Sequence, residues 1–200
     1  MALDIGPLGQ LLEPTGTLRF DDAYDCFAQM VRAGAKAGAD LVFMPIYYTP
    51  ASLILNQAKT MGYEPTFFGC DGMDGILDLE GFDTSLAEGL MLMTPFNAWG
   101  EDERTVKFVS EYQALAGGIP NQFAADGYDC IYAIYEACQK AGVTADMSHE
   151  DICAALISTF TSSDFSVDGL TGSGMTWAAT GEISKAPLVF EVQDGVYVAR

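Results

Sequence analysis

The sequence predicts an α/β protein with an open, mostly parallel sheet flanked by helices and a C-terminal pair of antiparallel or edge strands. Short apolar runs alternate with helical patterns over residues 22–112, as in parallel sheets joined by helical crossovers. The last forty residues change to a period of two with Gly/Asp turns, which is typical of antiparallel strands. Half of the 200 residues are hydrophobic and 18% are charged, so the chain is able to bury a core.

The alternating part begins with a helix, a strand and a second helix. Apolar residues at helical spacing predict the first helix over residues 22–38. The apolar run at 41–44 predicts a parallel strand that is buried on both faces. A second helix is expected from Pro50, which suits a first helical turn, to Gly62, which is a stop signal.

The strand-and-helix unit then recurs. A strand at 66–68 leads through a glycine-rich loop into a short helical stretch at 76–79. A third strand at 89–96 precedes an acidic helix start, which predicts a helix over 101–112.

Two helices and three strands complete the predicted elements. The helix at 123–140 is unusually apolar, so it requires cover on more than one side. A shorter helix follows at 149–158, and strands are expected at 175–177, 188–192 and 196–198.

Composition excludes several classes of function. Nine Lys and Arg against 28 Asp and Glu give a net charge of −19, which repels nucleic acid and anionic membrane surfaces. With His149 as its single histidine, the chain offers no multi-histidine metal site. Five cysteines without CxxC spacing indicate neither a disulfide framework nor a zinc site, so we expect no metal and no cofactor. No signal peptide or membrane-spanning run is recognisable.

The loop Gly69–Gly75 is the first candidate binding site, because ligands bind where strands lead into helices in open α/β sheets. Its GxxGxxG spacing differs from the dinucleotide-binding GxGxxG, and Asp71 and Asp74 place negative charge where a phosphate would sit. A carboxylate at this position suits an ammonium group. The alternative is that Asp71 or Asp74 only caps the following helix.

Tyr47 and Tyr48 lie in the equivalent loop after the preceding strand. An aromatic face beside a carboxylate is suited to a small cation or to the amine of an amino acid. The alternative is that one ring anchors the core and the other is merely exposed. Catalysis finds little support, because Ser173 lies outside a strand-to-helix GxSxG elbow.

Five separated signatures then occur in a recognisable order: ADLVFMPIYYTPASLILNQAKTMGY, PTFFGCDGMDG, AEGLMLMTPF, FVSEYQALAGGIPNQFAADGYDCIYAIYEACQKAG, and GLTGSGMTW with a terminal VFEVQDGVYV. This order resembles the second half of the branched-chain amino acid (Leu/Ile/Val-type) binding proteins of ABC transporters, over residues 22–200. The resemblance implies one lobe of a type I periplasmic binding protein, an amino acid ligand, no catalysis and an extracytoplasmic location. It also implies an ABC transporter permease as partner of the full-length protein.

The resemblance also assigns site residues. Tyr48 falls on the aromatic residue that contacts the ligand, and Asp71 falls on the acidic residue that pairs with the ligand's α-amino group. Tyr47 and Met73 are included as their neighbours in the sequence.

The density of glycine and proline predicts an N-terminal lead-in or tail over residues 1–20. By the same resemblance, residues 21–96 form the ligand-binding lobe. Residues 97–163 form helices that pack in the family on the other lobe, and 164–200 return to the ligand-binding lobe. The first-lobe sheet of the family has no counterpart here, so the apolar helices need another cover. We therefore expect a homo-oligomer or a partly swapped dimer, and the chain could be a truncated form that does not bind.

Three other functions are compatible with parts of the pattern. One is a sensor domain of the same fold that reports an amino acid or amide to a receptor or regulator. Another is a flavodoxin-like or Rossmann-like enzyme, which the acidic GCDGMDG loop disfavours. The third is a folded remnant without a ligand.

Overall fold

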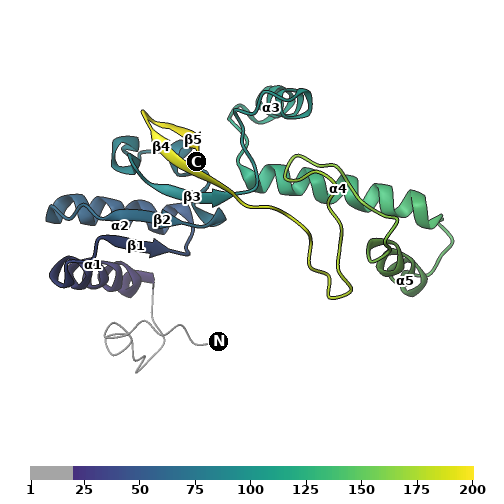
Figure 1. Ribbon diagram of the computed structural model, residues 1–200, viewed down its shortest axis with the longest axis horizontal. Helices are drawn as coiled ribbons and strands as arrows, with labels where there is room; N and C mark the ends of the chain where they lie inside the picture. The colour runs from purple at the N-terminus through teal and green to yellow at the C-terminus, as the bar shows by residue number, and fades with distance from the viewer. Residues whose placement is uncertain (1–19) are drawn as a thin grey trace. The chain divides into compact units, whose positions relative to one another are not determined.

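The computed structural model describes the backbone of residues 20–200 and the side chains from residue 27 onward (Figure 1). The lead-in expected at 1–20 therefore lies outside the described residues, except for Phe20. The chain forms two compact units. Unit 1 contains the chain up to Leu92 together with Phe190–Arg200, and unit 2 contains Met93–Val189.

Unit 1 is built around the sheet. Its elements are α1 (Phe20–Ala37), β1 (Leu41–Met44), α2 (Tyr48–Met61), β2 (Thr66–Gly69), the 3-10 turns η2 (Asp71–Met73), η3 (Ile76–Asp78) and η4 (Thr84–Ala87), β3 (Met91–Thr94), β4 (Leu188–Gln193) and β5 (Val196–Ala199). Strands β3 and β4 cross the boundary between the units. Helix α2 ends where expected, because Gly62 adopts the left-handed conformation (φ 64°) that glycine accepts at little cost.

The sheet confirms the predicted fold class. Its strand order is β1-β2-β3-β4-β5, with β1, β2 and β3 parallel and β4 and β5 antiparallel. The prediction of a strand at 175–177 is wrong, because Met175 and Trp177 each form only an isolated bridge. The neighbouring Thr176 is held by Ser184 through its backbone N–H and its hydroxyl, which makes a local turn rather than a sheet strand.

Strand β1 is less buried than the sequence predicted. It was predicted to be buried on both faces, but Leu41 is 54% and Phe43 51% exposed. Leu41 and Phe43 are two residues apart and therefore lie on the same face of the strand, and this face is incompletely covered. Met44, at the end nearest the site, is buried.

The core of unit 1 lies between α2, the 3-10 turns and the strands. Its most completely buried large side chains are Met73, Ile76, Leu90, Leu92, Phe190 and Val192. These residues come from both ends of unit 1, so the C-terminal strands complete a core that the earlier elements begin.

Unit 2 consists of α3 (Glu103–Ala116), α4 (Gln122–Ala141), α5 (His149–Phe160) and a return segment, residues 164–187. Each helix is capped by a side chain that accepts a backbone N–H: Asp102 for α3, Asn121 for α4 and Ser148 for α5. No helix among the described residues is long and apolar enough to cross a membrane.

The return segment lies in unit 2, and the part of the chain that follows it, Phe190–Arg200, lies in unit 1. The physical reason is a set of polar contacts with α4. Asp129 on α4 accepts the backbone N–H groups of Leu170 (2.7 Å) and Thr171 (2.8 Å), and Lys185 pairs with Asp126.

Candidate functional site

The loops that follow β1 and β2 meet at one edge of the sheet. Met44 is in register with Gly69, so the two parallel strands end at the same level. A β-carbon on Gly72 would stand 2.8 Å from the Ile46 carbonyl oxygen and 3.4 Å from the Tyr47 Cα. The two loops are therefore in backbone contact.

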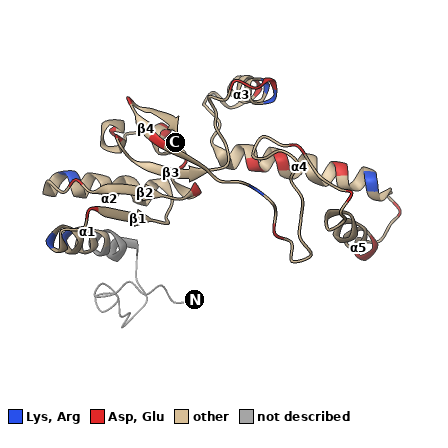
Figure 2. Cartoon of the chain, in the orientation of Figure 1, with Lys and Arg blue, Asp and Glu red and all other residues tan. Residues whose placement is uncertain are grey.

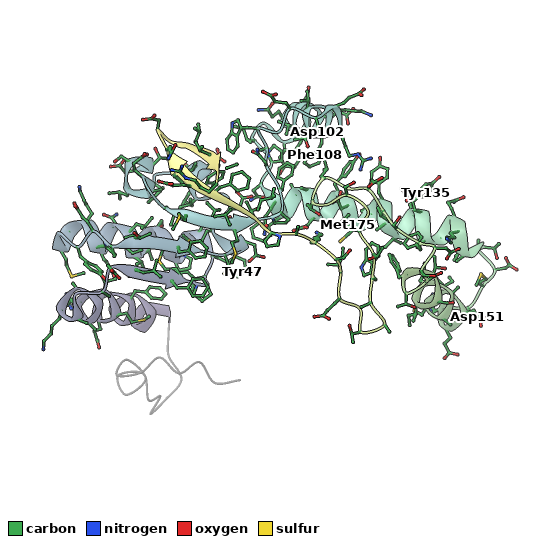
Figure 3. All side chains as sticks on the ribbon, viewed as in Figure 1. Tyr47, Asp102, Phe108, Tyr135, Asp151 and Met175 are labelled. Atoms are coloured by element: carbon green, nitrogen blue, oxygen red, sulfur yellow. The ribbon has the colours of Figure 1, made fainter. Side chains whose placement is uncertain are left out.

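The two tyrosines have different surroundings. Tyr47 stands at the N-cap of α2, and its side chain is 64% exposed (Figure 3). Tyr48 is the first residue of α2 and is half-buried against the core of unit 1. The ring of Tyr48 is thus anchored in the core, whereas the ring of Tyr47 is exposed beside the two loops.

The aspartates of the loop are also distinct. Asp71 is exposed and begins η2, directly after Cys70. Neither residue stands at an N-cap position, because the N-caps of η2 and η3 are Cys70 and Gly75. Asp71 is therefore available to a ligand.

Asp74, by contrast, is only 5% exposed, so its carboxylate is buried inside the protein. The Tyr197 hydroxyl of β5 faces it, and burial, reinforced by the Asp74 carboxylate, raises the pKa of Tyr197 above its usual value. The phenol therefore stays protonated beside the carboxylate. This contact joins the loop to the C-terminal strand.

The thiol of Cys70 is also affected by burial and by a neighbouring aspartate. Burial, followed by the nearby Asp71 carboxylate, raises the pKa of the Cys70 thiol. The thiol stays neutral near pH 7, so it is a poor nucleophile there.

Met73 lies in the core rather than in the site. Its side chain has no exposed surface and fills the space above Gly69, where a β-carbon would collide with it. Met73 supports the loop from below, and the exposed members of the predicted set are Tyr47 and Asp71.

Unit 2 holds a second arrangement that sequence reasoning did not assign to a site. Asp168 accepts hydrogen bonds from the Ser173 hydroxyl and the Gly174 N–H, both 2.7 Å long, and these bonds lower the pKa of Asp168. Ser173 thereby stabilises the turn. The turn lines a cavity of about 730 Å3, to which Arg104 also contributes.

The aspartate of the GYD sequence in α4, Asp129, has a structural role that the sequence did not predict. Asp129 is 5% exposed and accepts hydrogen bonds from Leu170 and from both the N–H and the hydroxyl of Thr171. The sequence signal was an acid among apolar residues of the helix pattern, and a buried carboxylate requires hydrogen-bond donors. Among the described residues, no cluster of three or more His, Cys, Asp or Glu is placed to hold a metal ion.

Comparison with known proteins gives consistent matches. A family model described as periplasmic binding protein matches residues 15–196. The leucine-, isoleucine-, valine-, threonine-, and alanine-binding protein of Pseudomonas aeruginosa is 24% identical over 116 residues, which are 58% of this chain and 31% of that protein.

Solved structures resemble the described fold. A leucine-binding protein from Thermotoga maritima has a TM-score of 0.69 and 22% identity, covering 87% of this chain and 47% of its own. A putative branched-chain amino acid ABC transporter protein from Rhodospirillum rubrum has a TM-score of 0.59 and 26% identity, and the match covers 94% of this chain and 50% of that protein. A benzoate-bound solute-binding protein from Rhodopseudomonas palustris has a TM-score of 0.72 and 15% identity, and the match covers 86% of this chain and 45% of that protein. The chain thus spans about half the length of these structures and less than a third of the curated relative.

Proposed function

The chain belongs to the periplasmic binding protein family, and from that premise we propose that it binds an amino acid for uptake by an ABC transporter. The match over residues 15–196 confirms the resemblance found in the sequence, and the solved structures confirm the predicted fold of one lobe. The similar proteins are solute-binding proteins rather than enzymes. An extracytoplasmic location and a permease partner follow from the same family as parts of the proposal.

The observation that carries the proposal is an exposed carboxylate beside an exposed aromatic ring. Asp71 and Tyr47 lie in loops that touch at Gly72, at the carboxyl ends of two parallel strands. A carboxylate forms a charge-assisted hydrogen bond with an ammonium group, and a ring face offers apolar contact to the rest of the ligand. We assign Asp71 to the α-amino group and Tyr47 and Tyr48 to the aromatic wall, with Met73 as the buried support of the loop.

An aromatic acid is the second candidate ligand. Solute-binding proteins from Rhodopseudomonas palustris are known in complex with 3,4-dihydroxybenzoic acid and with benzoate. A benzoate would bring a second negative charge toward Asp71, whereas an amino acid offers it a positive one. The charge of Asp71 therefore favours the amino acid. A sensor domain would bind through the same residues and differs only in its downstream partner.

The groups that bind the ligand's carboxylate are expected to belong to polypeptide outside this chain, because the relatives of this chain are about twice as long or more. Binding by this chain alone is therefore expected to be weak. A folded form that does not bind is one outcome of the test.

Isothermal titration with leucine tests the proposal. Wild-type protein is expected to give saturable heat that Asp71→Asn abolishes. Glu80→Gln is the matched control, because it removes the same charge from another exposed acid of unit 1. Benzoate is expected to give no heat.

Leucine binding that survives Asp71→Asn would overturn the assignment of Asp71. Saturable benzoate binding would transfer the proposal to aromatic acids. No heat from a cooperatively folding wild type would mean that this chain by itself does not perform the binding function.

A further inference from the structure

The turn that carries Asp71 is anchored in the interior of unit 1 by the residues that end it. The Met73 side chain has no exposed surface and lies so close to Gly69 that a β-carbon there would collide with it. Two backbone hydrogen bonds of 3.0 Å close the turn: the Met73 N–H donates to the Cys70 carbonyl oxygen, and the Asp74 N–H donates to that of Asp71. The exposed Asp71 therefore stands on a turn that ends in two buried residues, Met73 and Asp74.

Asp74 is a charged residue inside an apolar core. Its side chain is 5% exposed, and Met73 and Ile76, which flank it in the sequence, have no exposed surface. Residues 70–83 contain five acidic side chains and no Lys or Arg, as the red and blue segments of Figure 2 show. No positive charge within this stretch offsets the cost of burying the Asp74 carboxylate. A buried carboxylate then depends on hydrogen-bond donors.

Tyr197 of β5 brings a hydroxyl group to this carboxylate. Tyr197 is in register with Val192 of β4, and its ring contacts that of Phe190, with the two centroids 6.3 Å apart. The ring therefore packs against the core of unit 1. The carboxylates of Asp74 and Asp78 act on the Tyr197 phenol and, together with burial, keep it protonated. A protonated phenol is a neutral hydrogen-bond donor.

We propose that Tyr197 is a positioning residue of the amino acid site, which holds the turn of Asp71 in its binding conformation through Asp74. The Asp74 carboxylate lies beside the Tyr197 hydroxyl, and the Asp74 backbone N–H donates to the carbonyl oxygen of Asp71. A turn held in this way presents its exposed carboxylate in one place before a ligand arrives, which lowers the entropy cost of binding. This role rests on the proposed function for the identity of the ligand.

The hydroxyl of Tyr197, rather than its ring, carries this role. A phenylalanine at position 197 would fill the same space and contact Phe190 in the same way. Burial of a hydroxyl group is unfavourable unless the group finds a polar partner. Packing alone therefore does not account for a tyrosine at this position, whereas the buried carboxylate of Asp74 does.

Hydrogen exchange of backbone amides tests the proposal without a ligand. Tyr197→Phe removes only the hydroxyl. The Met73 and Asp74 amides, which close the turn, are expected to exchange at least about tenfold faster relative to the amides of α2. Tyr63→Phe is the matched control, because it removes a hydroxyl that donates to the Ala39 carbonyl oxygen at 2.8 Å in the same unit. This control is expected to leave exchange at the turn unchanged.

A double variant shows whether Tyr197 acts through Asp74. Asp74→Asn keeps the shape of the side chain and removes its charge. In that background, Tyr197→Phe is expected to accelerate exchange at the turn by less than about threefold, because the contact has already been altered. Two effects that multiply in full would mean that the residues act independently, which would overturn the proposal.

Titration with leucine connects the turn to the ligand. Tyr197→Phe is expected to weaken leucine binding about tenfold, and Tyr63→Phe is expected to leave it unchanged. Unchanged exchange at the turn in Tyr197→Phe would overturn the proposal. Equal acceleration of the turn and of α2 would do so as well, because it would indicate a loss of global stability. Faster exchange with undiminished leucine affinity would also overturn the positioning role.

Failure of the proposed function gives a different result. A wild-type protein that releases no heat with leucine would contradict amino acid binding by this chain. The exchange rates of Tyr197→Phe would still decide whether Tyr197 orders the turn, because they are measured without ligand.

Discussion

The main chain of Gly72 lies against that of Ile46 so closely that a β-carbon on Gly72 would stand 2.8 Å from the Ile46 carbonyl oxygen. This contact brings the loop of Asp71 to the loop of Tyr47. Because glycine is the one residue without a β-carbon, a local feature of the sequence decides whether the two halves of the candidate site meet.

Gly72→Ala is therefore expected to separate the loops. The added methyl group must displace backbone, which costs about 1–3 kcal/mol of unfolding free energy. Leucine binding should weaken in parallel. Urea unfolding measures the first effect and titration the second. Gly118→Ala is the control, since a β-carbon there meets nothing within 4 Å. Unchanged unfolding of Gly72→Ala would mean that the loops do not touch in solution.

Asp129 is expected to be the most sensitive acid of unit 2. Asp129→Ala leaves the N–H groups of Leu170 and Thr171 and the hydroxyl of Thr171 without their acceptor in a buried site. The expected loss of unfolding free energy is on the order of 2–4 kcal/mol. Asp146→Ala, at an exposed position of the same unit, should change it by less than about 0.5 kcal/mol. Similar losses for both variants would refute a special role for Asp129.

The turn around Asp168 is expected to loosen in acid. Hydrogen bonds from Ser173 and Gly174 lower the pKa of Asp168 below the usual value of about 3.9. A carboxylate whose pKa is lower in the folded state stabilises the fold at pH values above its unfolded pKa, and this contribution is lost as the pH falls through the folded pKa.

NMR titration of the Gly174 amide should therefore report a midpoint below about 3.9. The transition should disappear in Asp168→Asn, while other amides of the unit keep their own. A midpoint at or above the usual value would contradict the hydrogen bonds.

Cys70 is expected to react slowly with alkylating reagents. Burial and the Asp71 carboxylate raise the pKa of its thiol, so less thiolate is present at pH 7.5. Cys130 and Cys153 are exposed and should be labelled first. Mass spectrometry of iodoacetamide-treated protein gives the order. In Asp71→Asn the labelling of Cys70 should accelerate. Faster labelling of Cys70 than of Cys130 in the wild type would contradict the described surroundings.

The sequence predicted the parallel strands well because their signals are local. The apolar runs at 41–44 and 66–68 became β1 and β2, and the period-two pattern near the C-terminus became the antiparallel pair of β4 and β5. The long helix at 123–140 became α4, and its apolar character on two sides is visible in its side-chain periodicity. Spacing and turn residues within one segment are sufficient for such predictions.

The prediction that β1 is buried on both faces was wrong. An apolar run has the same pattern whether one or both faces of its strand are covered, since the cover comes from other segments of the chain. Leu41 and Phe43 lie on one face of β1, and both are more than half exposed.

By itself, the sequence determined the fold class, the loop in which the candidate carboxylate of Asp71 stands and the apolar character of helix α4, because glycine positions, charge and apolar periodicity are all properties of single segments. The tertiary structure alone decided that Asp71 is exposed while Met73, two residues later, is fully buried. It also decided that Asp129 holds the return segment and that this segment belongs to unit 2. Burial and hydrogen bonding of this kind depend on residues about 40 to 120 positions away in the chain, and no local pattern specifies which of them will meet.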